Sequence, residues 1–182
     1  MWKPVMLADS HLMSPQTMPD NPDTDTSRYF VIKGRRWRKT DPSIPPTLEK
    51  QLVRELMSAR RAVKTAKSTD DDEAMALARS RVNDAKISLG ERGRPWWETP
   101  TEESLKIRLT ATIQCLLRSR AQGKTICPSE AARVVGGEHW RDIMPQTIEA
   151  AWELENSGSL HVTQKGERVS QPTSGAIRLK NS

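Results

Sequence analysis

The chain has 182 residues, of which 35 % are hydrophobic and 29 % are charged, and its formal net charge is +6 at pH 7. This length allows one ordinary domain or two small ones, and the excess of bases favours an anionic partner. No apolar run approaches the roughly 20 residues of a membrane-spanning helix, and the N-terminal residues lack a convincing cleavage signal. We therefore expect a cytoplasmic protein that does not insert into a membrane.

Residues 1–27 are rich in Pro, Asp, Ser and Thr and show no periodicity. Such segments bury too little apolar surface to order themselves, so we predict a disordered tail. The segment YFVIK at residues 29–33 has the composition of a strand, and Gly34 after it indicates a turn or a bulge.

Bases and aromatic residues alternate through residues 28–42, RYFVIKGRRWRKTDP. Phosphate contacts from such bases give affinity with little sequence preference, and an aromatic ring can stack on a nucleic-acid base. We therefore assign nucleic-acid contacts to a block of five residues: Arg35, Arg36, Trp37, Arg38 and Lys39. The alternative is structural, with Trp37 packed across neighbouring helices and the arginines paired with acids on them.

Two amphipathic helices are predicted next, over residues 48–67 and 71–89, because apolar residues recur there at alternating spacings of three and four. Thr47 is the expected N-cap of the first helix, and Gly90 is placed to end the second. The short loop between two matching apolar seams predicts an antiparallel helical hairpin. Residues 28–98 carry seventeen bases and ten acids, so this module is basic.

Residues 91–103, ERGRPWWETPTEE, have the composition of a connector, and we place the break between two modules at 99–103. Two adjacent Trp follow a Pro in this connector. We expect Trp96 and Trp97 to pack against the helical hairpin, or at the seam between the modules, rather than to contact a ligand.

The second half has the element order of a winged helix-turn-helix. Helices are predicted over about 104–121, from Pro128 to Gly136, and over 145–156, and the strands SLHVTQ and AIRLK flank a KGER turn. We therefore expect a mainly α fold. In it a basic helical-hairpin module, residues 28–98, precedes a winged-helix domain of three helices and a two-stranded wing, residues 104–182.

Four motifs in this half, TICPSEAAR, HWRDIMP, ENSGSLHVTQKGERV and GAIRL, occur in the order found in a small bacterial winged-helix domain family of unassigned function. Residues 105–180 resemble that family. Residues 28–98 likewise resemble an uncharacterised bacterial module, through GRRWRKTDPSIP, LMSARRAV and LGERGRPWWE. The first resemblance implies a winged-helix fold for the C-terminal half, and neither implies an activity.

In DNA-binding winged helices the third helix enters the major groove and the wing contacts the backbone or the minor groove. We expect Ile148, Ala151 and Trp152 to face the core. Gln146 and Thr147 then face outward, where they can read base edges or bind phosphate. Further contacts are expected from bases on the wing and its flanks: Arg133, Arg141, Lys165 and Arg168.

Two acids stand on the same expected outward face, Glu149 and Glu153. Their carboxylates would repel phosphates, which counts against ordinary insertion of this helix into a DNA groove. A winged helix that binds protein is therefore the alternative. Each base of the wing, taken singly, also fits the simpler description of a solubilising surface charge.

The sequence contains no recognisable catalytic or metal-binding motif. Cys115 and Cys127 form neither a CxxC pair nor a zinc-binding spacing, and nucleophile-elbow, P-loop and Rossmann glycine patterns are missing. We expect no enzyme, no metal and no cofactor. The leading hypothesis is a nucleic-acid-binding protein that prefers duplex DNA to RNA and acts as a transcriptional regulator or a nucleoid-type accessory factor. The alternative is a protein–protein adaptor that docks through the helical hairpin and the winged helix.

Overall fold

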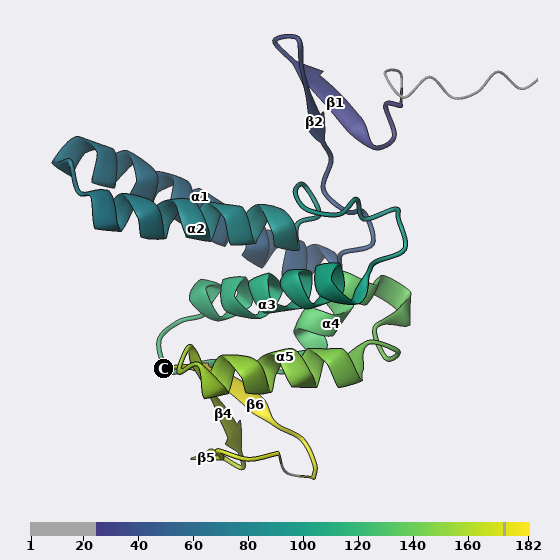
Figure 1. Cartoon of the computed structure of the whole chain (residues 1–182), viewed down its shortest axis with the longest axis vertical. Helices are drawn as coiled ribbons and strands as arrows, with labels where there is room; N and C mark the ends of the chain where they lie inside the picture. Colours follow the sequence, from purple (N-terminus) through teal and green to yellow (C-terminus); the bar gives the residue numbers. More distant parts are fainter. Residues whose placement is uncertain (1–24, 173) are drawn as a thin grey trace, which may run out of the picture.

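The computed structural model describes residues 25–172 and 174–182, and within these ranges the fold is mainly helical with two small antiparallel sheets (Figure 1). The expectation of a mainly α protein is therefore confirmed. The predicted disordered tail lies, except for residues 25–27, outside the described residues. No helix in the described ranges is long and apolar enough to cross a bilayer.

The chain first forms a two-stranded hairpin that extends away from the helices at one end of the molecule (Figure 1). Strand β1 (Tyr29–Ile32) pairs with β2 (Arg35–Arg38), and Lys33 and Gly34 form the turn with φ of 50° and 74°. A two-residue turn with both φ values positive matches the twist of a hairpin. We call residues 29–38 the arm. Its first strand was predicted, and its second was missed because RRWR carries too much charge to resemble a strand.

Helices α1 (Pro46–Thr69) and α2 (Asp72–Ser88) run antiparallel beside each other (Figure 1). The prediction that Thr47 caps α1 is wrong, because the helix already begins at Pro46. Proline is favoured at the first helical position, where its missing N–H costs nothing. Asp71 caps α2 by accepting a 2.9 Å hydrogen bond from the backbone N–H of Ala74.

Three further helices form the centre of the molecule: α3 (Glu102–Ser119), α4 (Pro128–Gly136) and α5 (Met144–Asn156). A single 3₁₀ turn, Gly137–His139, follows α4. Helix α3 begins at Glu102, two residues before the start predicted at about residue 104. The reason is a capping box, in which the Thr101 and Ser104 side chains each accept a hydrogen bond from the other residue's backbone N–H.

The second sheet has four strands in the described residues, in the order β3-β6-β4-β5. They are β3 (Thr125–Ile126), β4 (Leu160–Gln164), β5 (Glu167–Arg168) and β6 (Arg178–Asn181). The prediction of a two-stranded wing therefore left out two strands of this sheet. Strand β5 is the second half of the KGER motif and pairs with β4, whereas the later segment, β6, pairs with β4 on one side and β3 on the other.

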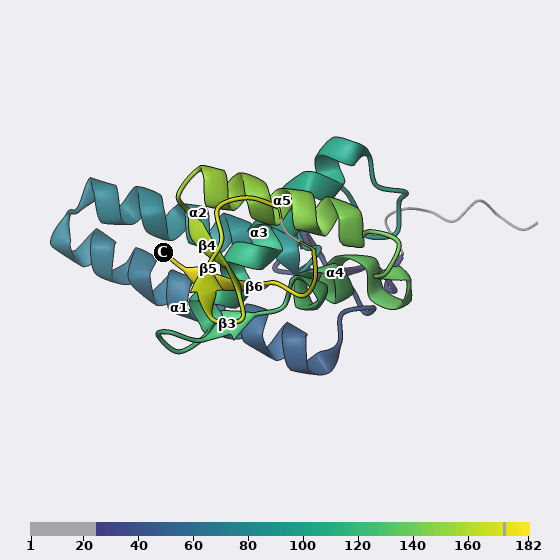
Figure 2. The same ribbon diagram turned by 90° about the horizontal axis from the view of Figure 1, so that it is seen from below.

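Buried side chains from both halves of the chain form one hydrophobic cluster. Leu52 and Leu56 of α1 and Leu89 after α2 join a set of fully buried residues from the C-terminal half: Leu109, Ile113, Leu116, Ile126, Val134, Leu160, Val162 and Leu179. Burying one such side chain stabilises the fold by about 1.5–3 kcal/mol. In Figure 2, α1 and β3 lie along one side of the protein and α5 lies along the other.

Gly90 holds the connector close to this cluster. Its φ is +76°, and a Cβ added there would lie 3.0 Å from Cδ1 of Trp96 and 3.1 Å from Cβ of Asp41. Both the backbone conformation and the close approach require glycine at this position. The sequence-based prediction that Gly90 ends α2 is consistent with this geometry.

Candidate functional site

Aromatic rings and guanidinium groups alternate on one face of the arm. Tyr29 lies edge-on to Trp97 of the connector, with ring centroids 5.5 Å apart. The guanidinium of Arg36 lies 4.2 Å from the Tyr29 ring centroid, and those of Arg28 and Arg38 lie 5.1 and 5.5 Å from that of Trp97. Cation–π attraction operates over these distances. The arm is thus anchored to the connector through stacked cations.

The opposite face of the arm centres on Trp37, which is half-buried. Arg35 lies 4.7 Å from its ring centroid and the ammonium of Lys86 lies 5.2 Å away. Trp37 therefore packs toward α2, as the structural alternative requires, and two cations lie over its ring. Its stacking on a nucleic-acid base stays a prediction.

The block of five predicted contact residues divides into two groups. Arg38 donates to the carbonyls of Gly90 and Gly93 at 3.3 and 2.9 Å, and the ammonium of Lys39 donates to the carbonyl of Thr26. These two side chains are half-buried and brace the base of the arm. Only Arg35 and Arg36, near the tip, are exposed. The assignment of Arg38 and Lys39 to nucleic acid stays a prediction, although both side chains already have backbone partners.

The tip of the arm also exposes apolar side chains. Phe30, Val31 and Ile32 are 42, 63 and 54 % exposed. Strand β1 therefore presents apolar surface and β2 presents cations on one projecting hairpin. Proteins that bind the DNA minor groove combine the same two kinds of side chain.

Trp96 and Trp97 pack against the base of the arm, and Trp96 also lines a cavity with Ile87 of α2 and Leu105 of α3, at the seam that was one of the two expected positions. The Trp96 indole N–H donates to the carbonyl of Lys39 at 3.2 Å, and the two rings meet edge to face with centroids 5.0 Å apart. The connector therefore fixes where the arm leaves the body of the protein.

The buried face of α5 differs from the expected one. Thr147 is fully buried together with Ala150 and Ala151, whereas Ile148 is 37 % exposed. The Thr147 hydroxyl donates to the carbonyl of Ile143 at 2.8 Å, which satisfies it inside the core. The prediction that Thr147 contacts nucleic acid is therefore wrong. Gln146 and Glu149 remain on the exposed side.

Two predicted contact residues, Arg133 and Arg141, meet on a single ring. Their guanidinium carbons lie 4.5 and 4.4 Å from the centroid of Trp140, and both arginines are exposed. Helix α4 supplies the first arginine and the turn before α5 supplies the second. The two arginines are eight residues apart in the sequence, and nothing in the sequence indicated that both would stack on one tryptophan ring.

The two predicted bases of the wing are both exposed but differ in their partners. Lys165 lies in the β4–β5 turn, whereas Nε and Nη2 of Arg168, whose side chain is 55 % exposed, donate to Oε1 of buried Glu155 at 2.9 and 2.6 Å. Burial opposes ionisation of Glu155, but hydrogen bonds from Arg168 and the Val162 N–H outweigh it and lower the pKa of Glu155. Arg168 thus forms an ion pair with a buried carboxylate, and its assignment to nucleic acid stays a prediction.

The described residues offer neither a metal centre nor an activated thiol at Cys115. They contain no group of three or more His, Cys, Asp and Glu side chains that could hold a metal ion. Burial raises the pKa of the Cys115 thiol to about 12, which removes it as a nucleophile at neutral pH. A cavity of about 120 Å³ lies between the connector and α3, and Trp96, Leu105 and Ile107 are among the residues that line it.

One basic surface was missed in the sequence. A groove of about 530 Å³ separates the start of α1 from the segment that joins α3 to β3, and Lys50, Arg54 and Lys124 line it. The spacing of Lys50 and Arg54 places them on the same helix face and could have been noticed. Nothing local in the sequence indicated that Lys124, seventy residues later, would lie opposite them.

Comparison with known proteins bears on the C-terminal half. Residues 106–182, from the first turns of α3 to the end of the sheet, match the profile of a family described as a protein of unknown function (DUF3253). This agrees with the expected resemblance to a C-terminal family of unassigned function. The match does not extend to residues 28–98, whose resemblance to a bacterial module stays a prediction. No curated protein matches the chain.

Proposed function

We propose that this protein binds nucleic acid, with duplex DNA as the ligand, and that its arm is the principal contact. The observation that carries the proposal is the projecting hairpin, on which exposed Arg35 and Arg36 stand beside apolar Phe30, Val31 and Ile32. Cations attract the phosphate backbone, and apolar side chains can enter the minor groove between base steps.

The C-terminal half supports the same proposal as a winged helix-turn-helix. Helices α3, α4 and α5 followed by β4, β5 and β6 have the element order of that architecture, and β3 pairs with β6 beside them. Arg133 and Arg141 on Trp140 and Lys165 in the β4–β5 turn supply exposed cations. A cytoplasmic regulator or nucleoid-type accessory factor is the role that fits such a protein.

The test measures the affinity of the full chain for a generic DNA duplex by fluorescence anisotropy, at a series of rising salt concentrations. We expect binding at low salt that weakens steeply as salt rises. The Arg35→Ala/Arg36→Ala variant should bind more weakly and lose about two units of the slope of log K against log salt. Arg92→Ala/Arg94→Ala, which removes the same charge from the connector, is the matched control. Absence of duplex binding by the wild-type protein at low salt would contradict the proposal.

A second function is favoured by the exposed face of α5. Ile148 of α5 is 37 % exposed beside Glu149 and Glu153 of the same helix, and Ile107 of α3 is 48 % exposed. This surface combines apolar side chains with the carboxylate of Glu149 and suits a protein partner, so the second candidate function is that of an adaptor. Affinity capture from lysate treated with nuclease distinguishes the two functions. The adaptor function requires a stoichiometric partner whose capture is abolished by Ile148→Lys and is unaffected by Arg35→Ala.

A further inference from the structure

The groove between α1 and the α3–β3 segment has walls from two distant parts of the sequence. Lys50, Gln51 and Arg54 line it from α1, and Arg120, Lys124 and Thr125 line it from the opposite side. The hydroxyl of Ser119 lies 3.5 Å from Oε1 of Gln51 and links the walls at one point. The β3–β6 register puts Lys180 directly opposite Thr125, so the Lys180 side chain leaves the same face of the sheet.

No carboxylate lines this groove. Arg120 is neutralised by an ion pair with Glu130. Three other bases of the groove are exposed and form no ion pair with any residue in the described ranges: Lys50, Arg54 and Lys124. The groove therefore combines three uncompensated positive charges with the hydroxyl and amide donors of Thr47, Gln51 and Thr125.

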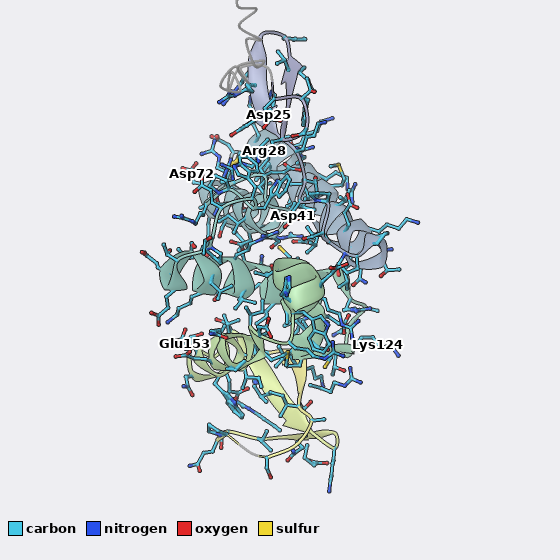
Figure 3. The ribbon with its side chains drawn as sticks, turned by 90° about the vertical axis from the view of Figure 1, so that its right-hand side faces the viewer. Asp25, Arg28, Asp41, Asp72, Lys124 and Glu153 are labelled. Carbon is cyan, nitrogen blue, oxygen red and sulfur yellow. The ribbon has the colours of Figure 1, made fainter. Side chains whose placement is uncertain are left out.

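A group of acids lies on the opposite side of the molecule. Glu149 and Glu153 lie on α5, Glu102 and Glu103 begin α3, and Glu153 is paired with Lys106. Figure 3 shows Lys124 and Glu153 on opposite sides of the body, and Figure 2 places α1 and α5 on opposite sides as well. A polyanion is consequently attracted to the groove and repelled from α5.

We propose that this groove binds the phosphate backbone of duplex DNA as a second contact surface. The inference rests on the proposed function and assigns to Lys50, Arg54 and Lys124 the role of phosphate contacts. No aromatic residue lines the groove, so it lacks the stacking platform that single strands require. Hydrogen-bond donors that contact phosphates and not base edges give an affinity that does not depend on the DNA sequence.

The location also resolves the difficulty posed by the acids of α5. A winged helix that inserted α5 into the major groove would bring Glu149 and Glu153 against phosphates. Contact through the groove instead keeps both acids on the far side of the protein. The groove thus adds α1 and the α3–β3 segment to the contact made by the arm, and α5 stays outside the interface.

The experiment compares three variants of the full chain on the same generic duplex. The groove variant is Lys50→Ala/Arg54→Ala/Lys124→Ala. The charge control is Arg60→Ala/Lys67→Ala/Arg79→Ala, which removes three exposed bases of α1 and α2 that do not line the groove. The third is the arm variant Arg35→Ala/Arg36→Ala. All the replaced side chains are exposed, so thermal unfolding midpoints should match that of the wild-type protein.

We expect the groove variant to bind at least about tenfold more weakly at moderate salt and to lose about three units of the salt slope. The charge control should lose much less affinity. Equal losses in the groove variant and the charge control would mean that net charge alone matters, and would overturn the inference. Unchanged binding by the groove variant together with weakened binding by the arm variant would overturn the inference and leave the proposed function intact.

Two further outcomes concern the ligand. Tighter binding of a single strand or an RNA duplex than of DNA, lost in the groove variant, would overturn the assignment to duplex DNA. Failure of the wild-type protein to bind any duplex at low salt would overturn the proposed function and this inference together.

Discussion

Nη2 of Arg108 in α3 lies 2.7 Å from Oδ2 of Asp41, and this ion pair joins the segment before α1 to the central helix. The two side chains are 14 and 5 % exposed. Oδ1 of Asp41 accepts hydrogen bonds from the backbone N–H and the hydroxyl of Ser43, so both carboxylate oxygens are satisfied. Sixty-seven residues separate the partners, and the pair couples the folding of the two halves.

Removal of the arginine should destabilise the whole protein. Arg108→Ala leaves the buried carboxylate of Asp41 without its cation, and we expect the free energy of unfolding to fall by about 3 kcal/mol. Urea denaturation followed by circular dichroism measures the change. Arg94→Ala is the matched control, because its ion pair with Glu98 is exposed and should contribute less than about 1 kcal/mol. A result for Arg108→Ala as small as the control would contradict the coupling.

The ion pair between Glu155 and Arg168 should make stability depend on pH. The pKa of Glu155 is lowered in the folded protein, so its carboxylate contributes stability above the unfolded pKa of about 4.3 and loses it as pH falls through the folded pKa. We expect Glu155→Gln to cost about 2 kcal/mol at pH 7 and progressively less below about pH 4. Urea denaturation of both proteins across this range gives the difference, with Glu149→Gln as the control. A difference that is the same at pH 3 and pH 7 would argue against an ionised Glu155.

The two thiols should differ in reactivity. Cys115 is fully buried and burial raises its pKa to about 12, whereas Cys127 is half-buried before α4. We expect the Cys127→Ser variant to resist a thiol-specific reagent while folded and to react fully once unfolded. Cys115→Ser should retain a reactive thiol in the folded state. Rapid modification of folded Cys127→Ser would show that Cys115 is reached by solvent.

The corrected orientation of α5 makes a further prediction. Thr147→Val keeps the shape of a buried side chain and removes one hydrogen bond, so we expect a loss of about 1 kcal/mol in unfolding free energy and no change in duplex binding. Gln146→Ala replaces the exposed neighbour and should leave stability unchanged. A loss of duplex binding in Thr147→Val at full stability would restore the original interpretation of this helix.

Local patterns were enough to predict the helices and several of their ends. The spacing of Leu52, Leu56 and Ala59 identifies α1, and Pro128 begins α4 where a first-turn proline is favoured. These features succeed because helix formation depends on contacts within a few residues along the chain. The capping of α3 by Thr101 is equally local and could have been predicted from the same rules.

The face of α5 could not be predicted in this way. Hydrophobicity favours Ile148 over Thr147 as the buried residue, but the backbone carbonyl of Ile143 satisfies the Thr147 hydroxyl and makes its burial inexpensive. The packing of Ala150 and Ala151 then sets the rotation of the helix. A threonine is ambiguous in a sequence because its cost of burial depends on a partner that only the structure identifies.

The sequence by itself determined where the helices lie, how much positive charge the chain carries and which segment alternates bases with aromatics. Only the tertiary structure decided which of those bases are available to a ligand. Arg38 and Arg168 are held by backbone carbonyls and by a buried carboxylate, whereas Lys50, Arg54 and Lys124 converge on one groove. The physical reason is that electrostatic and hydrogen-bond partners are chosen by distance in space, and chain folding brings together residues that local sequence patterns do not connect.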